Sequence, residues 1–305
     1  MTLGEFQTTH ERIRPYVRCT PTVPSELPGL WLKLESLQHT HSFKARGAFA
    51  HILKLVERED SRTILAVSAG NHGQAVARAA STFNRSCVVV VPQSAPKAKV
   101  EAIRSYGIEL KVLGANYDEA ESIALQMAKD SDRYAFVSPY NDIDVVLGQG
   151  SLAFEIFEQV PEVETLVIAV GGGGLIAGIA AAAKQMRPGV RVVGVQAEVS
   201  AAIYESLKAG RMVTVPDLPS IADGIQGNVD LATLTFPLIQ KYVDDVVLVS
   251  EEEIRRAMHH LFHKEKLVAE GSAAAAFAAV AEGKVKSKGP AVVVICGGNL
   301  DFKMF

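Results

Sequence analysis

The sequence predicts an α/β fold built on parallel sheet, and two observations carry that prediction. Short apolar, β-branched runs alternate with longer helical segments along the 305 residues, an order that produces parallel strands joined by right-handed crossover helices. Most of the short runs are almost continuously apolar, as strands covered on both faces require. At 48% hydrophobic residues, the chain can bury a substantial core.

The expected strands are apolar runs bounded by turn-forming residues. In chain order they are Thr63–Val67, Cys87–Val91, Glu109–Leu113, Tyr134–Val137, Thr165–Val170, Arg191–Gln196, Asp245–Val249 and Ala291–Ile295. The expected helices occupy Ser42–Glu57, His72–Thr82, Pro96–Tyr106, Tyr117–Lys129, Gly148–Phe157, Leu175–Met186, Glu251–Phe262 and Ser272–Ala281. Ser250 and Glu253 form a capping-box pattern, which marks the start of the helix after residue 250.

The length is about twice the ~150 residues typical of one domain, so one large domain or two intertwined domains are expected. No repeat, low-complexity tract or proline-rich linker divides the chain. A second domain is therefore expected to be inserted into the first rather than to follow it.

Composition excludes several classes of protein. With 31 Lys and Arg against 34 Asp and Glu, the net charge of −3 lacks the basic surface that nucleic-acid binding needs. Three widely spaced thiols, Cys19, Cys87 and Cys296, do not make a disulfide framework. The first 15 residues carry charges and no apolar signal segment. We therefore expect a reduced, cytoplasmic protein with neither a nucleic-acid nor a membrane partner.

One uncharged stretch, residues 165–183, is long enough to span a bilayer. Four consecutive glycines interrupt it: Gly171, Gly172, Gly173 and Gly174. Because each glycine costs a helix about 1 kcal/mol relative to alanine, a strand, a glycine turn and a helix explain the stretch better than a membrane span.

The glycine turn presents free N–H groups at a helix N-terminus, which is a phosphate-binding arrangement. Ile179 and Ala180 follow Gly178, so the P-loop pattern is absent, and the dinucleotide G-x-G-x-x-G pattern is incomplete. A dinucleotide site, with Glu198 as the ribose-binding acid, is weakened but stays open. The structural alternative is a tight turn with close packing.

Lys44 lies just inside a helix start, in Ser-Phe-Lys-Ala-Arg-Gly. A helix N-terminus and nearby Arg46 both disfavour an ammonium group, so the amine could stay neutral and nucleophilic. The alternative is an ordinary solvated helix residue.

The segment Ser68-Ala69-Gly70-Asn71-His72 follows a predicted strand and opens a helix. Its N–H groups, the Ser68 hydroxyl and the Asn71 amide could bind an anion, or Asn71 could simply cap the helix. The last strand ends in Cys296-Gly297-Gly298-Asn299, where the cysteine alone would read as a buried small apolar residue.

His259 and His263 have the i, i+4 spacing of a metal pair. The His-Glu-x-x-His pattern is absent and no acidic third ligand is evident, so we expect a solvated helix face and no metal site.

Taken in this order, the motifs resemble those of the fold type II pyridoxal-phosphate enzymes, in the serine/threonine dehydratase and serine racemase branch. The resemblance extends over nearly the whole chain. It includes Lys33-Leu34-Glu35 with Gln38, Gly148-Gln149-Gly150, Ile221-Ala222-Asp223-Gly224 and Val243-Asp244-Asp245. The cysteine-synthase branch would instead show Asn-Thr-Gly at Asn71-His72-Gly73.

The resemblance implies two open, mostly parallel twisted sheets covered by helices, as in tryptophan synthase beta-like proteins. A small mobile domain, residues 48–143, would be inserted into a large cofactor-binding domain, residues 1–47 and 144–305. It also implies a homodimer.

The resemblance further implies the role of each site residue. Lys44 would form a Schiff base with pyridoxal 5'-phosphate, and Phe43 would pack beside the ring. The phosphate would lie on Gly171, Gly172, Gly173, Gly174 and Leu175, the ring hydroxyl on Asn71, the imine near Gly224 and the ring nitrogen near Cys296. The substrate carboxylate would bind Ser68, Ala69, Gly70, Asn71 and His72.

The activity implied is β-elimination from L-threonine or L-serine, giving a 2-oxo acid and ammonia. Alternatives are a dehydratase for a rarer 3-hydroxy amino acid, such as hydroxyaspartate or phenylserine, a serine racemase, a non-catalytic homologue or a nicotinamide dehydrogenase. Ala69 replaces a racemase serine, so racemization is disfavoured. Gln196 and Ala202 replace acidic metal ligands, so that metal site is lost unless Glu198 substitutes. His41, where a glycine is usual, and Tyr140 are expected near the substrate side chain.

Overall fold

The computed structural model describes residues 1–216 and 218–300 and contains two separate sheets. The larger sheet has the strand order β1-β2-β10-β7-β8-β9, and only β1 runs antiparallel to its neighbour. Its strands are β1 Thr22–Pro24, β2 Leu30–Leu34, β7 Thr165–Ala169, β8 Arg191–Ala197, β9 Asp245–Val249 and β10 Ala291–Ile295. The predicted fold class, α/β with two mostly parallel sheets, is confirmed.

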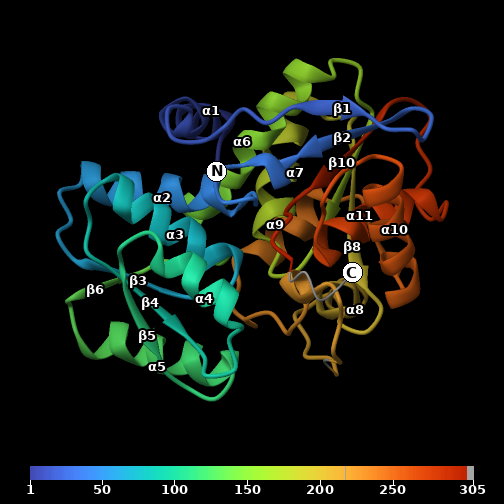
Figure 1. Ribbon diagram of the computed structural model, residues 1–305. Helices are drawn as coiled ribbons and strands as arrows, with labels where there is room; N and C mark the ends of the chain where they lie inside the picture. Colours follow the sequence, from blue (N-terminus) through green and yellow to red (C-terminus); the bar gives the residue numbers. More distant parts are fainter. Residues whose placement is uncertain (217, 301–305) are drawn as a thin grey trace.

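The smaller sheet is inserted in the sequence between β2 and β7 and has the order β5-β4-β3-β6, all parallel. Its strands are β3 Thr63–Val67, β4 Cys87–Val91, β5 Glu109–Val112 and β6 Tyr134–Phe136. Along β3, Ile64 and Ala66 pack with residues of α2 and α3, whereas Leu65 and Val67 pack against α5. Both faces are therefore covered, as the continuous apolar runs predict (Figure 1).

Helices surround both sheets (Figure 1). They are α1 Leu3–Ile13, α2 Lys44–Glu57, α3 Asn71–Thr82, α4 Lys97–Arg104, α5 Tyr117–Asp130, α6 Ile143–Gln159, α7 Gly174–Met186, α8 Ala202–Ala209, α9 Thr235–Tyr242, α10 Glu251–His263 and α11 Gly271–Ala281, with 3₁₀ turns η1 Glu35–Leu37 and η2 Asp223–Ile225. The Ser250–Glu253 capping box at the start of α10 is present as predicted. No helix in the described part of the chain has both the length and the apolarity to cross a bilayer.

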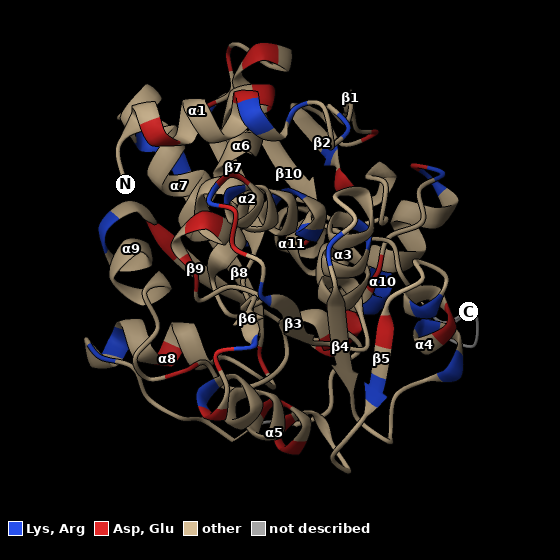
Figure 2. Ribbon diagram, turned by 90° about the vertical axis from the view of Figure 1, so that its left-hand side faces the viewer, with Lys and Arg blue, Asp and Glu red and all other residues tan. Residues whose placement is uncertain are grey.

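Some elements were not predicted: α1, β1, β2, α8 and α9. The prediction for α6 was wrong at its start, since the helix begins at Ile143 rather than at Gly148. Asp142 caps it by accepting a hydrogen bond from the Val145 N–H at 2.9 Å, a start signal that the sequence contains. Acidic and basic positions are interspersed along the helices, in keeping with the small net charge (Figure 2).

Candidate active site

A cavity of about 750 Å³ lies where the carboxyl ends of strands from both sheets face each other. All predicted site residues line it, although they come from distant parts of the chain. They are Phe43, Lys44, Ser68, Ala69, Gly70, Asn71, His72, Gly171, Gly172, Gly173, Gly174, Leu175, Gly224 and Cys296. In open α/β sheets, this edge is where ligands bind.

The glycine turn between β7 and α7 forms an anion cradle on one wall of the cavity. Within the described residues, the N–H groups of Gly171–Leu175 have no hydrogen-bond acceptor. The Gly172 carbonyl is held by the Thr235 hydroxyl at 2.8 Å, which fixes the turn from behind. Free N–H groups at the positive end of a helix attract a phosphate.

Close packing, the structural alternative for the glycines, is also real. A Cβ at Gly172 would lie 2.3 Å from a Tyr140 ring atom, and a Cβ at Gly173 would lie 2.7 Å from Ile239 Cδ1. Gly173 also has a φ of 84°, which favours glycine. Packing explains why glycines are needed here, and the free N–H groups explain what the resulting turn can bind.

Lys44 is the first residue of α2 and reaches into the same cavity. Its Nζ donates to the Pro139 carbonyl at 2.7 Å, and Tyr140, the next residue, covers the glycine turn. Burial lowers the pKa of Lys44 to about 8, while the Cys296 and Glu270 side chains act in the opposite direction. The solvated-lysine alternative is therefore wrong.

The expected contribution of Arg46 to this pKa is also wrong. Arg46 is fully buried and pairs with Glu35 at 2.8 Å and Glu155 at 2.7 Å. Lys33 binds the same Glu155 at 2.6 Å. The guanidinium charge is thus compensated inside a structural ion cluster and leaves Lys44 to burial alone.

The Ser68–His72 loop presents its backbone to the cavity, but its side chains are bonded to the protein. Ser68 Oγ accepts from the Gly70 N–H at 3.0 Å. Gly70, not Asn71, occupies the N-cap position of α3, so the capping alternative for Asn71 is wrong. The N–H groups of Asn71 and His72 remain without acceptors among the described residues, and they suit a carboxylate.

His72 is buried and neutral. Its Nε2 lies 2.9 Å from the Val137 carbonyl, to which it donates, and burial, followed by the Lys44 charge, lowers the His72 pKa to about 3. The ring anchors the segment that carries Pro139, the hydrogen-bond partner of Lys44. Through its side chain, His72 therefore acts on Lys44 rather than on a substrate.

Cys296 ends β10 below the cavity, and its carbonyl accepts from the Phe43 N–H at 3.0 Å. Burial raises the pKa of its thiol well above the ordinary value, so the group is a neutral thiol. The Phe43 ring centroid lies 5.1 Å from Lys44 Nζ. Gly224 faces the buried Ser272 hydroxyl, which has no partner among the described residues and also lines the cavity.

Glu270 and Asn299 are site residues that the sequence did not identify. Glu270 lines the cavity at the start of α11 and accepts from Asn71 Nδ2 at 2.8 Å. Asn299 belongs to the Gly-Gly-Asn motif and donates to Asn71 Oδ1 at 2.7 Å. An acid directly before the buried, alanine-rich α11 is the one signal that could have pointed to Glu270.

His41 and Tyr140 lie elsewhere than expected or act differently. His41 does not belong to the cavity wall; its φ of 55° explains why a glycine is usual there. Tyr140 lines the cavity but mainly packs on the glycine turn.

Metal and dinucleotide ligands are not provided around this cavity. Gln196 Oε1 accepts from the Tyr204 N–H at 2.8 Å, and Glu198 lies 3.8 Å from Lys284, outside the cavity wall. The ribose-binding acid of a nicotinamide site therefore has no counterpart among the lining residues.

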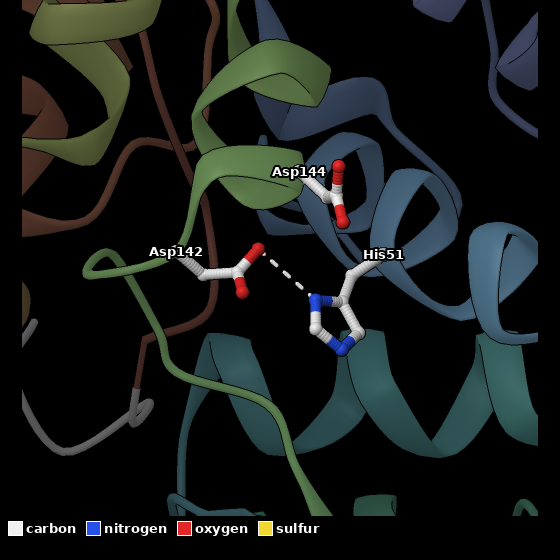
Figure 3. Close-up of side chains that lie close together, drawn as sticks. All are labelled: His51, Asp142 and Asp144. Atoms are coloured by element: carbon white, nitrogen blue, oxygen red, sulfur yellow. Dashed lines mark hydrogen bonds and ion pairs between the residues drawn. The ribbon is translucent and has the colours of Figure 1, made fainter.

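One cluster elsewhere has metal-ligand spacing within the described residues: His51, Asp142 and Asp144 (Figure 3). His51 lies 3.0 Å from Asp142, which also caps α6, and Asp144 is paired with Lys54. These groups satisfy one another without an ion. His259 and His263, stacked at 5.6 Å on α10, are not part of such a cluster.

The residues present fit pyridoxal phosphate. The free N–H groups of the glycine turn match a phosphate, the Lys44 amine of lowered pKa matches an aldehyde, and the Cys296 thiol matches an unprotonated ring nitrogen. All three line one cavity.

Comparison with known proteins agrees with this chemistry. A family model described as pyridoxal-phosphate dependent enzyme matches residues 13–297. The chain is 44% identical to an L-threonine ammonia-lyase of Thermotoga maritima, over 100% of this chain and 77% of the relative. It is 36% identical to an L-threonine dehydratase catabolic TdcB of Staphylococcus aureus, over 99% and 90%.

Solved structures show the same fold. Maize serine racemase superposes with a TM-score of 0.93 at 31% identity, covering 99% of this chain and 95% of that one. The serine racemase of Dictyostelium discoideum gives 0.89 at 35% identity, covering 99% of both chains. A bacterial-type threonine deaminase, from T.th., gives 0.90 at 34% identity, again covering 99% of both chains.

Proposed function

Because this chain belongs to the family of pyridoxal-phosphate dependent enzymes, we propose that it deaminates L-threonine or L-serine by β-elimination of water. One water leaves and one is consumed in hydrolysis, so the net products are a 2-oxo acid and ammonia. The observation that carries the proposal is the Lys44 amine, with a pKa of about 8, in the same cavity as the free N–H groups of the glycine turn.

When bound, pyridoxal phosphate supplies an aldehyde for amines and a sink for negative charge at the substrate Cα. The N–H groups of Gly171–Leu175 hold the phosphate, and those of Asn71 and His72 hold the substrate carboxylate. The neutral Cys296 thiol leaves the ring nitrogen unprotonated. That weaker sink favours prompt loss of the β-hydroxyl over transamination.

Lys44 is the base that removes the Cα proton. With a pKa of about 8, roughly a tenth of these amines are neutral at pH 7, against far fewer for an ordinary lysine. The Pro139 carbonyl, 2.7 Å from Nζ, holds the amine inside the cavity.

The charge of the cavity wall supports a substrate with a neutral side chain. Four acids line it, Asp118, Glu121, Asp223 and Glu270, against Lys44 and Lys99, and Lys99 is paired with Asp223 at 2.9 Å. A second carboxylate, as in hydroxyaspartate, would meet this negative wall without a free cation. Ala69 has no proton to give, which supports elimination over racemization.

We place the small domain at residues 48–143; all four strands of the smaller sheet lie within these limits. A homodimer is supported by exposed apolar Leu37 and Val268, on segments that meet beside Gly298. A cytoplasmic location is supported by three unpaired cysteines. Light scattering of the purified chain tests the dimer.

The decisive experiment is a screen of the cofactor-loaded protein for ammonia and 2-oxo acid. We expect turnover of L-threonine and L-serine, and at least about tenfold lower kcat/KM for 3-hydroxyaspartate. Phenylserine tests the size of the pocket. Absence of ammonia from every one of these substrates would overturn the proposal in favour of a non-catalytic homologue.

A further inference from the structure

Glu270 is a buried carboxylate without a cationic partner among the described residues. It is 5% exposed and lines the cavity at the N-cap of α11. Its two oxygens accept from Asn71 Nδ2 at 2.8 Å and from the Asn299 backbone N–H at 3.2 Å. A Cβ at Gly297 would lie 2.4 Å from Oε1, so the glycine makes room for this carboxylate.

The surrounding network fixes the direction of the Asn71 amide. The Thr40 carbonyl only accepts, so Asn299 turns its Nδ2 toward it, at 2.8 Å. The same nitrogen donates its second hydrogen to Asn71 Oδ1 at 2.7 Å. Asn71 must then direct its own Nδ2 to Glu270, the acceptor at the other end of the chain of hydrogen bonds.

We propose that Glu270 is a positioning residue for the cofactor: it binds one hydrogen of Asn71 Nδ2 and thereby directs the other into the cavity, toward the ring oxygen of pyridoxal phosphate. The inference rests on the proposed function for the identity of this ligand. The ring oxygen is acidic and carries negative charge when ionised, so a donor at this point binds it and an amide oxygen would repel it. Glu270 thus sets which end of Asn71 the cofactor meets.

Glutamine at this position cannot replace the carboxylate. Asn71 Nδ2 and the Asn299 N–H are both donors and need two acceptor oxygens, whereas a glutamine side chain has one. In Glu270→Gln, one donor is left unpaired or the Asn71 amide turns over. Glu270→Asp keeps two acceptor oxygens and is expected to retain more of the function.

The test measures ligand binding to the cofactor-free chain by equilibrium dialysis, without substrate. The two probes are pyridoxal phosphate and its 3-deoxy analogue, which lacks the ring oxygen. We expect Glu270→Gln to weaken binding of pyridoxal phosphate about tenfold and to leave the analogue unchanged. In an Asn71→Ala background, Glu270→Gln should have no further effect, because it acts through Asn71.

Glu265→Gln is the matched control. Glu265 is also buried and also accepts from a hydroxyl and a backbone N–H, those of Ser25 and Glu26, but it lies outside the cavity wall. We expect it to bind both probes like the unmodified chain.

Equal weakening for both probes, or the same loss with and without Asn71, would overturn the proposal. If Glu270→Gln does not fold, the unmodified chain decides, since equal affinity for the two probes would also overturn it. Because no turnover is measured, these outcomes are independent of whether threonine or serine is the substrate.

Discussion

Lys33 and Lys44 are both removed from bulk water, but only Lys44 faces the cavity. Lys33 is 0% exposed, and its Nζ lies 2.6 Å from Glu155. Lys44 has a backbone carbonyl and no carboxylate as its hydrogen-bond partner among the described residues, and its pKa falls to about 8. The missing counter-charge, in addition to burial, is what makes one of the two lysines reactive.

The buried glutamates differ in the same way. Arg46 and Lys33 hold the pKa of Glu155 below its usual range, although burial alone would raise it. Glu270 has no such partner, and burial raises its pKa to about 7. One region therefore uses paired charges for structure, and the other keeps charges unpaired for chemistry.

The sharpest test of this difference is Lys44→Ala. Loss of the base and of the amine that bonds to the cofactor should reduce kcat at least about a thousandfold. Free energy of unfolding at pH 7 should stay equal or rise. The folded pKa of Lys44 lies below the unfolded one, so its unfavourable contribution is present below about pH 8 and is relieved as the pH rises to about 10.5.

Turnover assays and urea unfolding measure the two quantities. Lys97→Ala, at an exposed lysine of α4 outside the cavity wall, is the control and should change neither. Residual turnover within tenfold of the original enzyme would contradict the role of Lys44.

In the paired region, Arg46→Met should act on stability. It leaves Glu35 buried without its partner and Glu155 with only Lys33, which we expect to cost about 3–5 kcal/mol in the free energy of unfolding. Arg104→Met, at an exposed pair with Glu101, should cost less than about 1 kcal/mol. Equal effects of the two variants in denaturant titrations would refute the distinction between buried and exposed pairs.

The fold was predictable where elements are locally apolar, and less so where charges are buried. Every strand from β3 to β10 follows a continuous apolar run. β2 was missed because Lys33 interrupts its pattern, and only the distant Glu155 makes that lysine compatible with the core. For α1 the signal existed, since Thr2 and Glu5 form a capping box at its start.

The site follows the same division. The glycine turn and Lys44 lie in short motifs and were predictable. The direction of the Asn71 amide depends on Glu270 and Asn299, which are 199 and 228 residues away in the sequence. Local pattern contains no information on such contacts, because the two sheets must first come together.

A pH titration of stability tests the unpaired acid. The pKa of Glu270 is about 7 in the folded chain against about 4.5 unfolded, so the folded state binds more protons between these values. Stability is therefore lost as the pH rises from about 4.5 to about 7, by roughly 3 kcal/mol. Glu270→Gln removes this component, so its stability relative to the unmodified chain should rise over that window. Parallel stability curves for the two proteins would contradict the raised pKa.

The smallest effect is expected where charges are paired but exposed. Lys99 of α4 binds Asp223 of η2 at 2.9 Å across the cavity, with side chains 25% and 61% exposed. Since water already solvates both groups, Lys99→Met should change the free energy of unfolding by less than about 1 kcal/mol, and about 1 M salt should remove the difference. Urea unfolding at low and high salt measures it. A larger loss that persists in salt would mean that this contact helps to hold the small sheet against the large one, and pairing rather than burial would then decide what a charge contributes.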